Sequence, residues 1–250
     1  MKKIKVAVCG ANGKMGKEVV AAVLSEPDLE LVAKIDIFNG EYNSIEQAKN
    51  KCDIDVIIDF TQPEAIFENV KICLQNGIKP VVGTTGLTDA QIAEIKELSR
   101  QKGVACLIAP NFSTGAILMM MFAEHAAKYF DNAEIIELHH NQKKDAPSGT
   151  AIKTALMMSK AKESFKAGNC PEKETITGSR GGTSYSDIQI HSVRMPGFMA
   201  SQEVIFGSMG QTFKIRHDSV DRKCYMPGVI MAVRYVAEHD DFVYGLENIL

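Results

Sequence analysis

The residues with the clearest chemical potential lie together between Glu134 and Ala151. A strand-like apolar run ends in His139 and His140, Lys143 follows three residues later, and a Pro-Ser-Gly-Thr sequence then begins a helical pattern. An imidazole titrates near neutral pH, so either histidine could give or take a proton. A desolvated lysine could do the same, or could pair with an anion. The segment therefore predicts acid–base chemistry on an anionic ligand.

The start of the following helix predicts a carboxylate-binding site. Ser148 is typical of an N-cap, and the backbone N–H groups of Gly149 and Thr150 would then face an anion placed at the helix N-terminus. Gly149 has no Cβ to obstruct the anion, and the hydroxyl of Thr150 adds a donor. Lys143 could pair with the same carboxylate.

Zinc binding is the alternative chemistry for a pair of histidines. Adjacent residues of a strand point to opposite faces of the sheet. The segment also lacks an H-E-x-x-H pattern and has no cysteine nearby. We therefore expect no metal site. A further interpretation of the histidine pair is a polar strand edge without a catalytic role. The choice between His139 and His140 as the proton donor stays open.

A second candidate site lies near residue 10, where a strand-like run over residues 4–9 leads into a helical pattern. The loop has the spacing G-x-x-G-x-x-G, and Met15 stands where a P-loop requires Ser or Thr. Glycines at such a turn let the backbone approach a pyrophosphate, which the helix N-terminus attracts. A simple strand-to-helix turn is the alternative. The residues expected to bind a dinucleotide here are Gly10, Ala11, Asn12, Gly13, Lys14, Met15 and Gly16.

Asp36 stands twenty residues beyond Gly16, at the end of the second strand-like run. A carboxylate at this position can bond the ribose hydroxyls of NADH and would repel the 2′-phosphate of NADPH. Its neighbour is Ile37 rather than an arginine, while Lys34 lies close enough to soften the repulsion. The sequence therefore favours NADH weakly over NADPH, and an exposed aspartate at a strand end is the alternative interpretation.

The elements that must position these residues follow a βαβ rhythm over the first 110 residues. Near-continuous apolar runs are typical of parallel strands covered on both faces, which predicts a Rossmann-type doubly wound α/β fold. Strands are expected near 4–9, 30–35, 55–60, 80–83 and 104–108, and helices near 14–25, 64–76 and 88–101. Ligands of such sheets bind beyond the carboxyl ends of the strands. Two more loops should therefore flank the cofactor: Gly83-Thr84-Thr85-Gly86 and Ala109-Pro110-Asn111-Phe112.

The rhythm changes after residue 111 to a pattern typical of an α+β domain. Helices are expected near 114–129 and 149–162, and strands near 133–140, 187–194, 202–207 and 211–217. A later apolar helical pattern over 228–236 could return to the first domain. We therefore expect a discontinuous dinucleotide-binding domain of residues 1–112 and 219–250, and a second, substrate-binding domain of residues 113–218.

Charge and cysteine usage bear on partners and location. The formal net charge is −3 and the basic residues are scattered, so no nucleic-acid partner is expected. No run of 18 apolar residues and no apolar leader is present, so neither a membrane span nor export is expected. The six cysteines form no C-x-x-C pair and lie mostly in apolar runs, which predicts reduced thiols in a cytoplasmic protein.

The segment over 134–151 resembles the signature E-x-x-E-x-H-H-x-x-K-x-D-A-P-S-G-T-A of the dihydrodipicolinate reductases, also called 4-hydroxy-tetrahydrodipicolinate reductases. Residues 10–16, 83–86 and 109–113 resemble that family's nucleotide loop, its nicotinamide-side loop and its hinge into the substrate domain. Residues 244–250 resemble its tail, so the likeness spans essentially the whole chain. The resemblance implies an enzyme of the diaminopimelate route to lysine. It would use NADH or NADPH to reduce 4-hydroxy-tetrahydrodipicolinate, or its dehydrated form, to tetrahydrodipicolinate.

The resemblance also implies roles for single residues. It implies His139 as the proton donor or acceptor and Lys143 as a second proton donor. The implied substrate contacts are His140, Gly149 and Thr150. Some relatives place an acidic residue followed by Arg near the adenosine ribose, and the Asp36-Ile37 pair departs from that pattern. Because the family usually forms tetramers through the sheet of the substrate domain, we expect a homotetramer with residues 113–218 serving oligomerisation.

Two other functions remain open at this level. Another nicotinamide-dependent oxidoreductase of the aspartate pathway, such as a homoserine-dehydrogenase-like enzyme, would carry a different catalytic segment. A nucleotide-sensing regulatory module would have no use for the histidine and lysine cluster. Such a module should also carry a partner-binding or DNA-reading helix, and the sequence shows neither.

Overall fold

The computed structural model describes residues 3–166, 168 and 170–250, which form two compact units. Unit 1 comprises Met1–Thr114 and Arg222–Leu250, and unit 2 comprises Gly115–Asp221. Residues 1, 2, 167 and 169 fall within the two predicted domains but lie outside the described residues. Among the residues that are described, no helix has the length and apolar character needed to cross a membrane.

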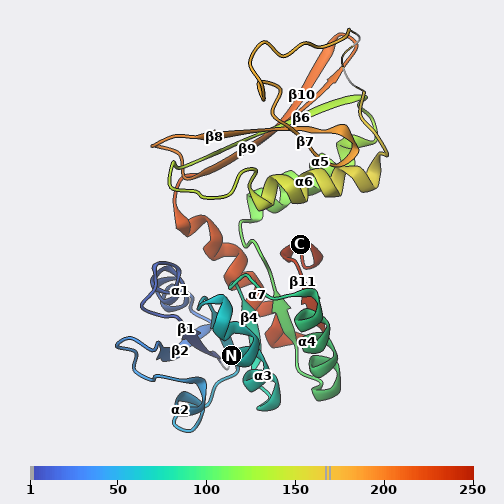
Figure 1. Ribbon diagram of the computed structural model, residues 1–250. Helices are drawn as coiled ribbons and strands as arrows, with labels where there is room; N and C mark the ends of the chain where they lie inside the picture. The colour runs from blue at the N-terminus through green and yellow to red at the C-terminus, as the bar shows by residue number, and fades with distance from the viewer. Residues whose placement is uncertain (1–2, 167, 169) are drawn as a thin grey trace. The chain divides into compact units, whose positions relative to one another are not determined.

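Unit 1 is built on a six-stranded sheet with the order β11-β5-β4-β3-β1-β2 (Figure 1). Every neighbouring pair of strands is parallel. Ile57 and Ile58, which point to opposite faces of β3, are both fully buried, as expected for a sheet covered on both sides. The strands are β1 (Ile4–Cys9), β2 (Leu29–Ile35), β3 (Val56–Asp59), β4 (Lys79–Val82), β5 (Cys106–Ile108) and β11 (Phe242–Tyr244).

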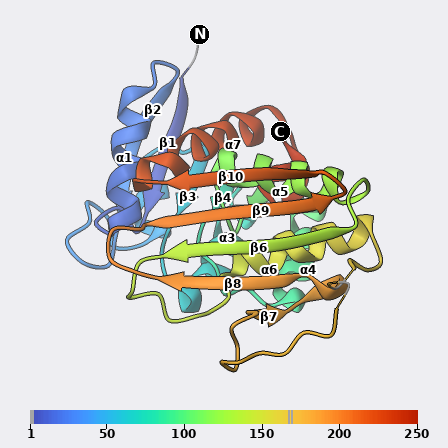
Figure 2. The same cartoon turned by 90° about the horizontal axis from the view of Figure 1, so that it is seen from above.

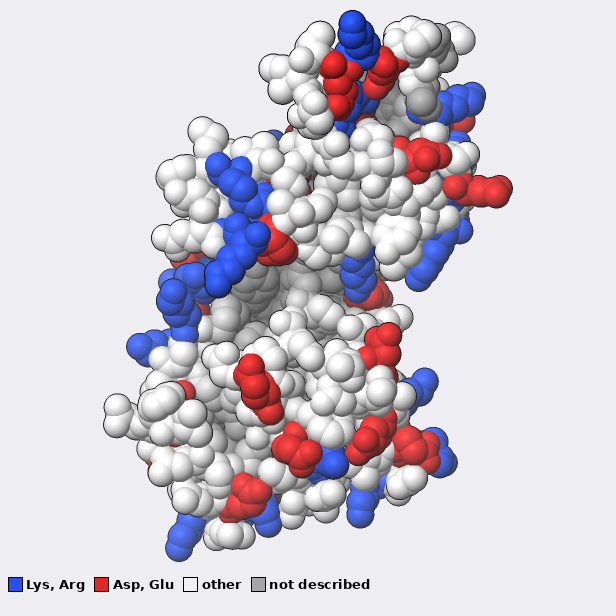
Figure 3. Space-filling view, viewed as in Figure 1, with Lys and Arg blue, Asp and Glu red and all other residues white. Residues whose placement is uncertain are grey.

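Helices cover both faces of this sheet, which confirms the predicted doubly wound α/β architecture. Helix α1 packs beside α7 and helix α3 beside α4, and α7 contacts β3, β4 and β5 (Figures 1 and 2). Charged side chains of both signs are interspersed on the face of this unit drawn in Figure 3. The helices are α1 (Lys14–Ser25), α2 (Ile45–Lys49), α3 (Pro63–Gln75), α4 (Asp89–Lys102) and α7 (Met226–Glu238), with short 3-10 turns at Arg222–Tyr225 and Leu246–Asn248.

The strand order of unit 1 marks a candidate ligand-binding edge. From β1 the chain runs through α1 to β2 on one side, whereas β3 pairs with the other side of β1. In doubly wound sheets the crevice for a ligand lies beyond the carboxyl ends of the strands at such a reversal. The loops after β1, β2, β3, β4 and β5 all leave from this edge because the strands are parallel.

Unit 2 contains a five-stranded mixed sheet with the order β10-β9-β6-β8-β7. Strands β6 and β8 are parallel, and the other neighbours are antiparallel. Figure 2 shows this sheet face-on with α5 and α6 behind it. The elements are α5 (Thr114–Ala127), β6 (Asn132–His139), α6 (Gly149–Ala161), β7 (Gly182–Thr183), β8 (Gln189–Arg194), β9 (Ala200–Ser208) and β10 (Gln211–Ser219), with a 3-10 turn at Tyr185–Asp187.

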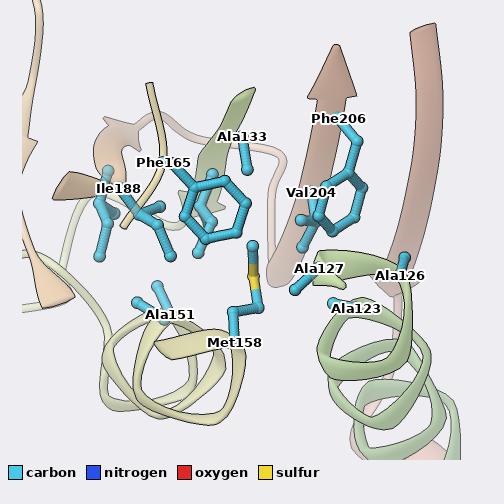
Figure 4. Close-up of a cluster of buried hydrophobic side chains, with 13 residues drawn as sticks. Ala123, Ala126, Ala127, Ala133, Ala151, Met158, Phe165, Ile188, Val204 and Phe206 are labelled. Atoms are coloured by element: carbon cyan, nitrogen blue, oxygen red, sulfur yellow. The ribbon is translucent and has the colours of Figure 1, made fainter. Parts of the chain in front are cut away.

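The core of unit 2 fills the space between the sheet and its two helices (Figure 4). Met158 of α6 and the small Ala127 of α5 pack with Phe206 of β9, and all three are fully buried. Ile135 of β6 belongs to the same cluster. Because side chains alternate along a strand, the inward position of Ile135 also sets Glu137 and His139 toward the helices.

Candidate active site

Strand β6 carries a charged residue into the interior of unit 2. Glu137 is fully buried, and hydrogen-bond donors surround its carboxylate. Arg194 of β8 donates from Nη1 to Oε2 at 2.8 Å and from Nη2 to Oε1 at 2.7 Å. The backbone N–H of Ser148 donates to Oε1 at 3.2 Å, and Nδ1 of His139 lies 2.5 Å from Oε2. A buried carboxylate is tolerated only with such partners.

The contacts of Glu137 decide its charge and that of His139. Burial raises the pKa of Glu137, but hydrogen bonds from Arg194, Ser192 and His139 outweigh it and hold the pKa below its usual value. Burial lowers the pKa of His139; the hydrogen bond and charge of Glu137 raise it, and the positive charges of Lys143 and Arg194 lower it. The net effect is a pKa of His139 below the ordinary value, so the neutral imidazole prevails at neutral pH.

Lys143 lies in the loop between β6 and α6, where Asp145 holds its ammonium group. Nζ of Lys143 lies 2.8 Å from Oδ1 and 2.9 Å from Oδ2 of Asp145, and this contact lowers the pKa of Asp145. The carbonyl oxygen of Asp145 accepts a 2.8 Å hydrogen bond from Nη2 of Arg194. Arg194 therefore ties the lysine loop to the carboxylate of Glu137.

The start of α6 has the features of an anion site. The Ser148 hydroxyl accepts from the N–H of Ala151 at 3.2 Å, which confirms Ser148 as the N-cap, and the first turn holds no acidic residue. A Cβ added at Gly149 would meet no atom within 4 Å, and Gly149 is exposed. The space beside this helix start is therefore open to a ligand, while Thr150 is partly buried.

The two adjacent histidines have different surroundings. His139 is partly buried beside Glu137, whereas His140 is exposed and its Nδ1 accepts from the N–H of Gln142 at 3.2 Å. His139 is the last residue of β6 and His140 lies just beyond it, so the alternation of the strand does not fix the direction of the His140 side chain. The structure thus brings His139 and the Lys143 charge together in unit 2, and it shows no such contact for His140 among the described residues.

In unit 1 the loop predicted to bind a pyrophosphate joins β1 to α1, and close backbone contacts require its glycines. Gly10 has φ +74°, and a Cβ there would lie 2.4 Å from the carbonyl oxygen of Phe60. A Cβ at Gly16 would lie 2.0 Å from the carbonyl oxygen of Gly10. Gly13, the N-cap of α1, offers no side-chain bond to the first turn, and that turn has no acidic residue. An anion can therefore reach the first N–H groups of α1.

Asp36 closes the same loop from the end of β2. Its Oδ2 accepts from the N–H of Asn12 at 2.9 Å, and its Oδ1 accepts from the N–H of Phe38 at 2.9 Å. Lys34 is engaged elsewhere, because its Nζ lies 2.9 Å from Glu41. The contacts bring the carboxylate of Asp36 next to the loop, and the charge of Lys34 is compensated by an acidic partner.

Asp59, at the end of β3, links two loops of the candidate ligand-binding edge. It is 1% exposed, and its Oδ1 accepts from the Thr61 hydroxyl at 2.7 Å and from the Thr84 hydroxyl at 2.8 Å. Asn69 of α3 donates to Oδ2 at 2.8 Å. This network fixes Thr84 and with it the loop after β4.

Phe60 follows Asp59 and fills the space between the other loops of this edge. Its ring lies where a Cβ of Gly83 would fall, 2.2 Å away, and its centroid is 6.0 Å from that of Phe112. Of the predicted cofactor residues, Asn12, Gly13, Lys14, Thr85 and Pro110 are exposed, and Ala11, Gly16, Thr84, Ala109 and Phe112 are buried. The buried members can shape the loops but offer a ligand little surface.

Sequence reasoning missed four residues of these two sites. Asp59 ends the third strand and Phe60 follows it. The rule that ligands bind beyond the carboxyl ends of the strands, used for the other loops, applies to that loop too. Glu137 carries a signal as well, because it is a charged residue at an inward position of an apolar strand. Arg194 lies 57 residues from Glu137 in sequence, and no local pattern marks it.

Comparison with known proteins gives a consistent picture along the whole chain. The family model described as "Dihydrodipicolinate reductase, N-terminus" matches residues 4–112, and "Dihydrodipicolinate reductase, C-terminus" matches residues 115–250. The 4-hydroxy-tetrahydrodipicolinate reductase of Streptococcus pneumoniae serotype 19F (strain G54) is 50% identical over 254 residues, covering 99% of each chain.

Two solved structures extend the comparison. A dipicolinate-bound dihydrodipicolinate reductase from Paenisporosarcina sp. TG-14 matches with a TM-score of 0.92 at 44% identity, over 99% of this chain and 100% of that chain. A probable dehydrogenase from Thermotoga maritima matches with a TM-score of 0.66 at 11% identity, over 98% of this chain and 92% of that one. The second likeness concerns the fold alone.

Proposed function

The chain belongs to the dihydrodipicolinate reductase family, and on that premise we propose how its own residues carry out the family's reaction. The activity is the reduction of 4-hydroxy-tetrahydrodipicolinate in lysine biosynthesis, and the family uses a nicotinamide cofactor. Neither alternative function, another oxidoreductase of the aspartate pathway or a regulatory module, is supported. We assign unit 1 to the dinucleotide and unit 2 to the substrate and to oligomerisation.

The observation that carries the proposal is the arrangement at the end of β6 and the start of α6. The imidazole of His139 contacts Glu137, the charge of Lys143 acts on that imidazole, and the start of α6 contacts Glu137 through the Ser148 N–H and leaves open space at Gly149. A dicarboxylate of the dipicolinate type needs several donors to replace its hydration. Gly149, Thr150 and His140 would hold its carboxylates, and the ammonium of Lys143 would exchange Asp145 for the substrate.

Proton transfer falls to His139 and Lys143. When bound, the nicotinamide supplies the hydride. His139 then provides a proton to the reduced substrate from its ring, and Lys143 serves as the second donor. The negative substrate would raise the low pKa of His139, because a nearby anion favours the imidazolium form. The dehydrated form accepts the hydride and the proton directly, whereas the hydroxylated substrate must first lose its hydroxyl group and a neighbouring ring proton as water.

Activity measurements with single variants test these roles. The assay follows NADH absorbance with enzymatically generated 4-hydroxy-tetrahydrodipicolinate. The kcat of His139→Ala and of Lys143→Ala should each fall on the order of a hundredfold, because a positioned general acid typically contributes a factor of this size to the rate. Lys144→Ala is the matched control, because Lys144 is the exposed neighbour and should keep kcat. Wild-type turnover in both His139→Ala and Lys143→Ala would contradict the assignment.

Gly149→Ala tests the anion site separately. Because no atom lies within 4 Å of the added Cβ, the substitution should leave the unfolding free energy unchanged or slightly higher. The methyl group would nevertheless occupy the space assigned to the substrate carboxylate, so KM for the substrate should rise roughly tenfold. An unchanged KM would place the carboxylate elsewhere.

For the cofactor, residues of unit 1 fit a dinucleotide, and we propose a weak preference for NADH. The uncapped start of α1 would receive the pyrophosphate, and the loops after β4 and β5 would adjoin the nicotinamide and its ribose. Asp36 would bond the adenosine ribose and repel a 2′-phosphate, while Lys34 is held by Glu41. Wild type should therefore show the higher kcat/KM with NADH, and Asp36→Asn should reduce the difference. A clear NADPH preference of the wild type would refute the proposal.

We propose a cytoplasmic homotetramer assembled through the sheet of unit 2. The face of this sheet turned away from α5 and α6 carries half-buried apolar residues on neighbouring strands, namely Ile136, Leu138, Val193 and Ile205. Burying such a face in an interface is favourable. Light scattering should give about 110 kDa, four times the 27.4 kDa of one chain. Ile205→Lys should lower that mass, and a monomeric wild type would rule the assembly out.

A further inference from the structure

Glu137 lies at the junction of the elements that carry the proposed catalytic groups. On one side it contacts Nδ1 of His139, and on the other it receives the N–H of Ser148, where α6 begins. Nη1 and Nη2 of Arg194 both donate to the carboxylate, and Arg194 also binds the carbonyl oxygen of Asp145. One fully buried carboxylate thus connects the histidine, the anion-binding helix start and the lysine loop.

Hydrogen-bond chemistry fixes the tautomer of His139. A carboxylate has no proton to donate, so Nδ1 must carry the hydrogen in the 2.5 Å contact with Oε2 of Glu137. The bidentate guanidinium of Arg194 keeps Glu137 in its ionised form. The remaining ring nitrogen, Nε2, is then the atom at which a proton arrives or leaves.

The geometry points to Glu137 as a positioning residue of the reductase: it holds His139 as the Nδ1–H tautomer, leaves Nε2 for proton transfer, and with Arg194 anchors the loop of Lys143. This inference rests on the proposed role of His139 and deepens it. Glu137 itself touches neither substrate nor cofactor. Its effect passes through the orientation and the proton affinity of the imidazole.

Glu137→Gln tests the inference because it keeps the size of the side chain and removes its charge. The amide can offer its N–H₂ group to Nδ1 and so favour the wrong tautomer. We expect kcat to fall about ten- to hundredfold, the typical effect of removing the group that orients a reactive histidine, with KM changed less than about threefold. Because Glu137 raises the pKa of His139, its loss should move the decline of kcat with rising pH to lower pH.

Glu134→Gln is the matched control on the same strand. Glu134 also binds an arginine and a histidine, with Nη2 of Arg180 at 2.5 Å and Nε2 of His191 at 2.8 Å. It points to the opposite face of β6, so the variant should keep wild-type kcat and pH profile. Light scattering on both variants separates an effect on assembly from an effect on positioning.

Neutron diffraction from deuterated wild-type crystals gives a readout that needs no variant. At a pH above the pKa of His139 the deuterium should reside on Nδ1 and not on Nε2. Deuterium on Nε2 alone would overturn the inference. The inference would also fail if Glu137→Gln kept the wild-type kcat and pH profile while His139→Ala was inactive. If His139→Ala itself keeps full turnover, the proposed function of that residue fails instead.

Discussion

Gly16→Ala should disrupt the cofactor loop, whereas Gly13→Ala should be tolerated. A Cβ at Gly16 would lie 2.0 Å from the carbonyl oxygen of Gly10 and 2.8 Å from Cα of Ala11. Both neighbours are backbone atoms, so no side chain can rotate away. At Gly13 the nearest atom is the same Gly10 oxygen at 3.2 Å, and φ is −68°, which suits alanine.

The size of the effect follows from these distances. Ordinary contact begins at 3.4 Å, so the start of α1 must withdraw by roughly 1.4 Å from Gly10. Overpacking of this kind costs about 1–3 kcal/mol of unfolding free energy. Each kcal/mol corresponds to about 2–4 °C in Tm for a chain of this size. Losing one N–H bond to a phosphate removes about 1.5–3 kcal/mol of binding, which is roughly ten- to a hundredfold in Kd.

Calorimetric titration with NADH and a thermal melt measure both quantities. Gly16→Ala should bind NADH at least tenfold more weakly and melt several degrees lower, while Gly13→Ala should stay within about threefold of wild-type Kd. Wild-type affinity in Gly16→Ala would refute the assignment of the pyrophosphate to the start of α1. Equal losses in both variants would show that the backbone clash is not the cause.

Three further outcomes follow from the burial of single side chains. The pKa of His139 lies below its usual value, chiefly because of burial. The protonated form of the free enzyme is therefore lost as pH rises through that pKa, and kcat/KM should decline. A profile of kcat/KM that stays flat from about pH 5 to 8 would contradict the role of His139 as the acid. Met158→Ala should lower the unfolding free energy by about 2–5 kcal/mol in denaturant titrations, against about 1 kcal/mol or less for the partly exposed Leu156→Ala. Burial raises the pKa of the Cys106 thiol, so iodoacetamide followed by peptide mapping should label exposed Cys170 in the native protein and Cys106 only after unfolding.

Long periodic segments of the fold could be predicted because their patterns are local. The helix expected over 14–25 is α1 (Lys14–Ser25), and most other boundaries differ by one or two residues. The elements not predicted are short: α2, β7 and β11. A strand of three residues such as β11 has no pattern of its own and forms because Phe242 and Tyr244 pair with Cys106 and Ile108 of β5. Such a strand depends on a partner more than a hundred residues away.

In the two candidate sites, too, the local features could be predicted from the sequence and the long-range contacts could not. Local spacing indicated the helix starts at Gly13 and Ser148, because capping and glycine geometry are properties of neighbouring residues. The pairing of Glu137 with Arg194 could not be predicted, because it depends on the parallel register of β6 and β8. Sequence spacing also left Lys34 near Asp36 with no sign that Glu41 compensates its charge.

The late position of β11 and α7 in the chain has a consequence during synthesis on the ribosome. Unit 2 is encoded entirely before Arg222, so its sheet and helices can close while unit 1 still lacks a helix and its edge strand. Until residues 242–244 emerge, β5 presents an unpaired backbone edge at Cys106 and Ile108, and the sheet face that α7 will cover stays bare. Nascent chains stalled before Arg222 should therefore be the species most prone to aggregation or capture by chaperones.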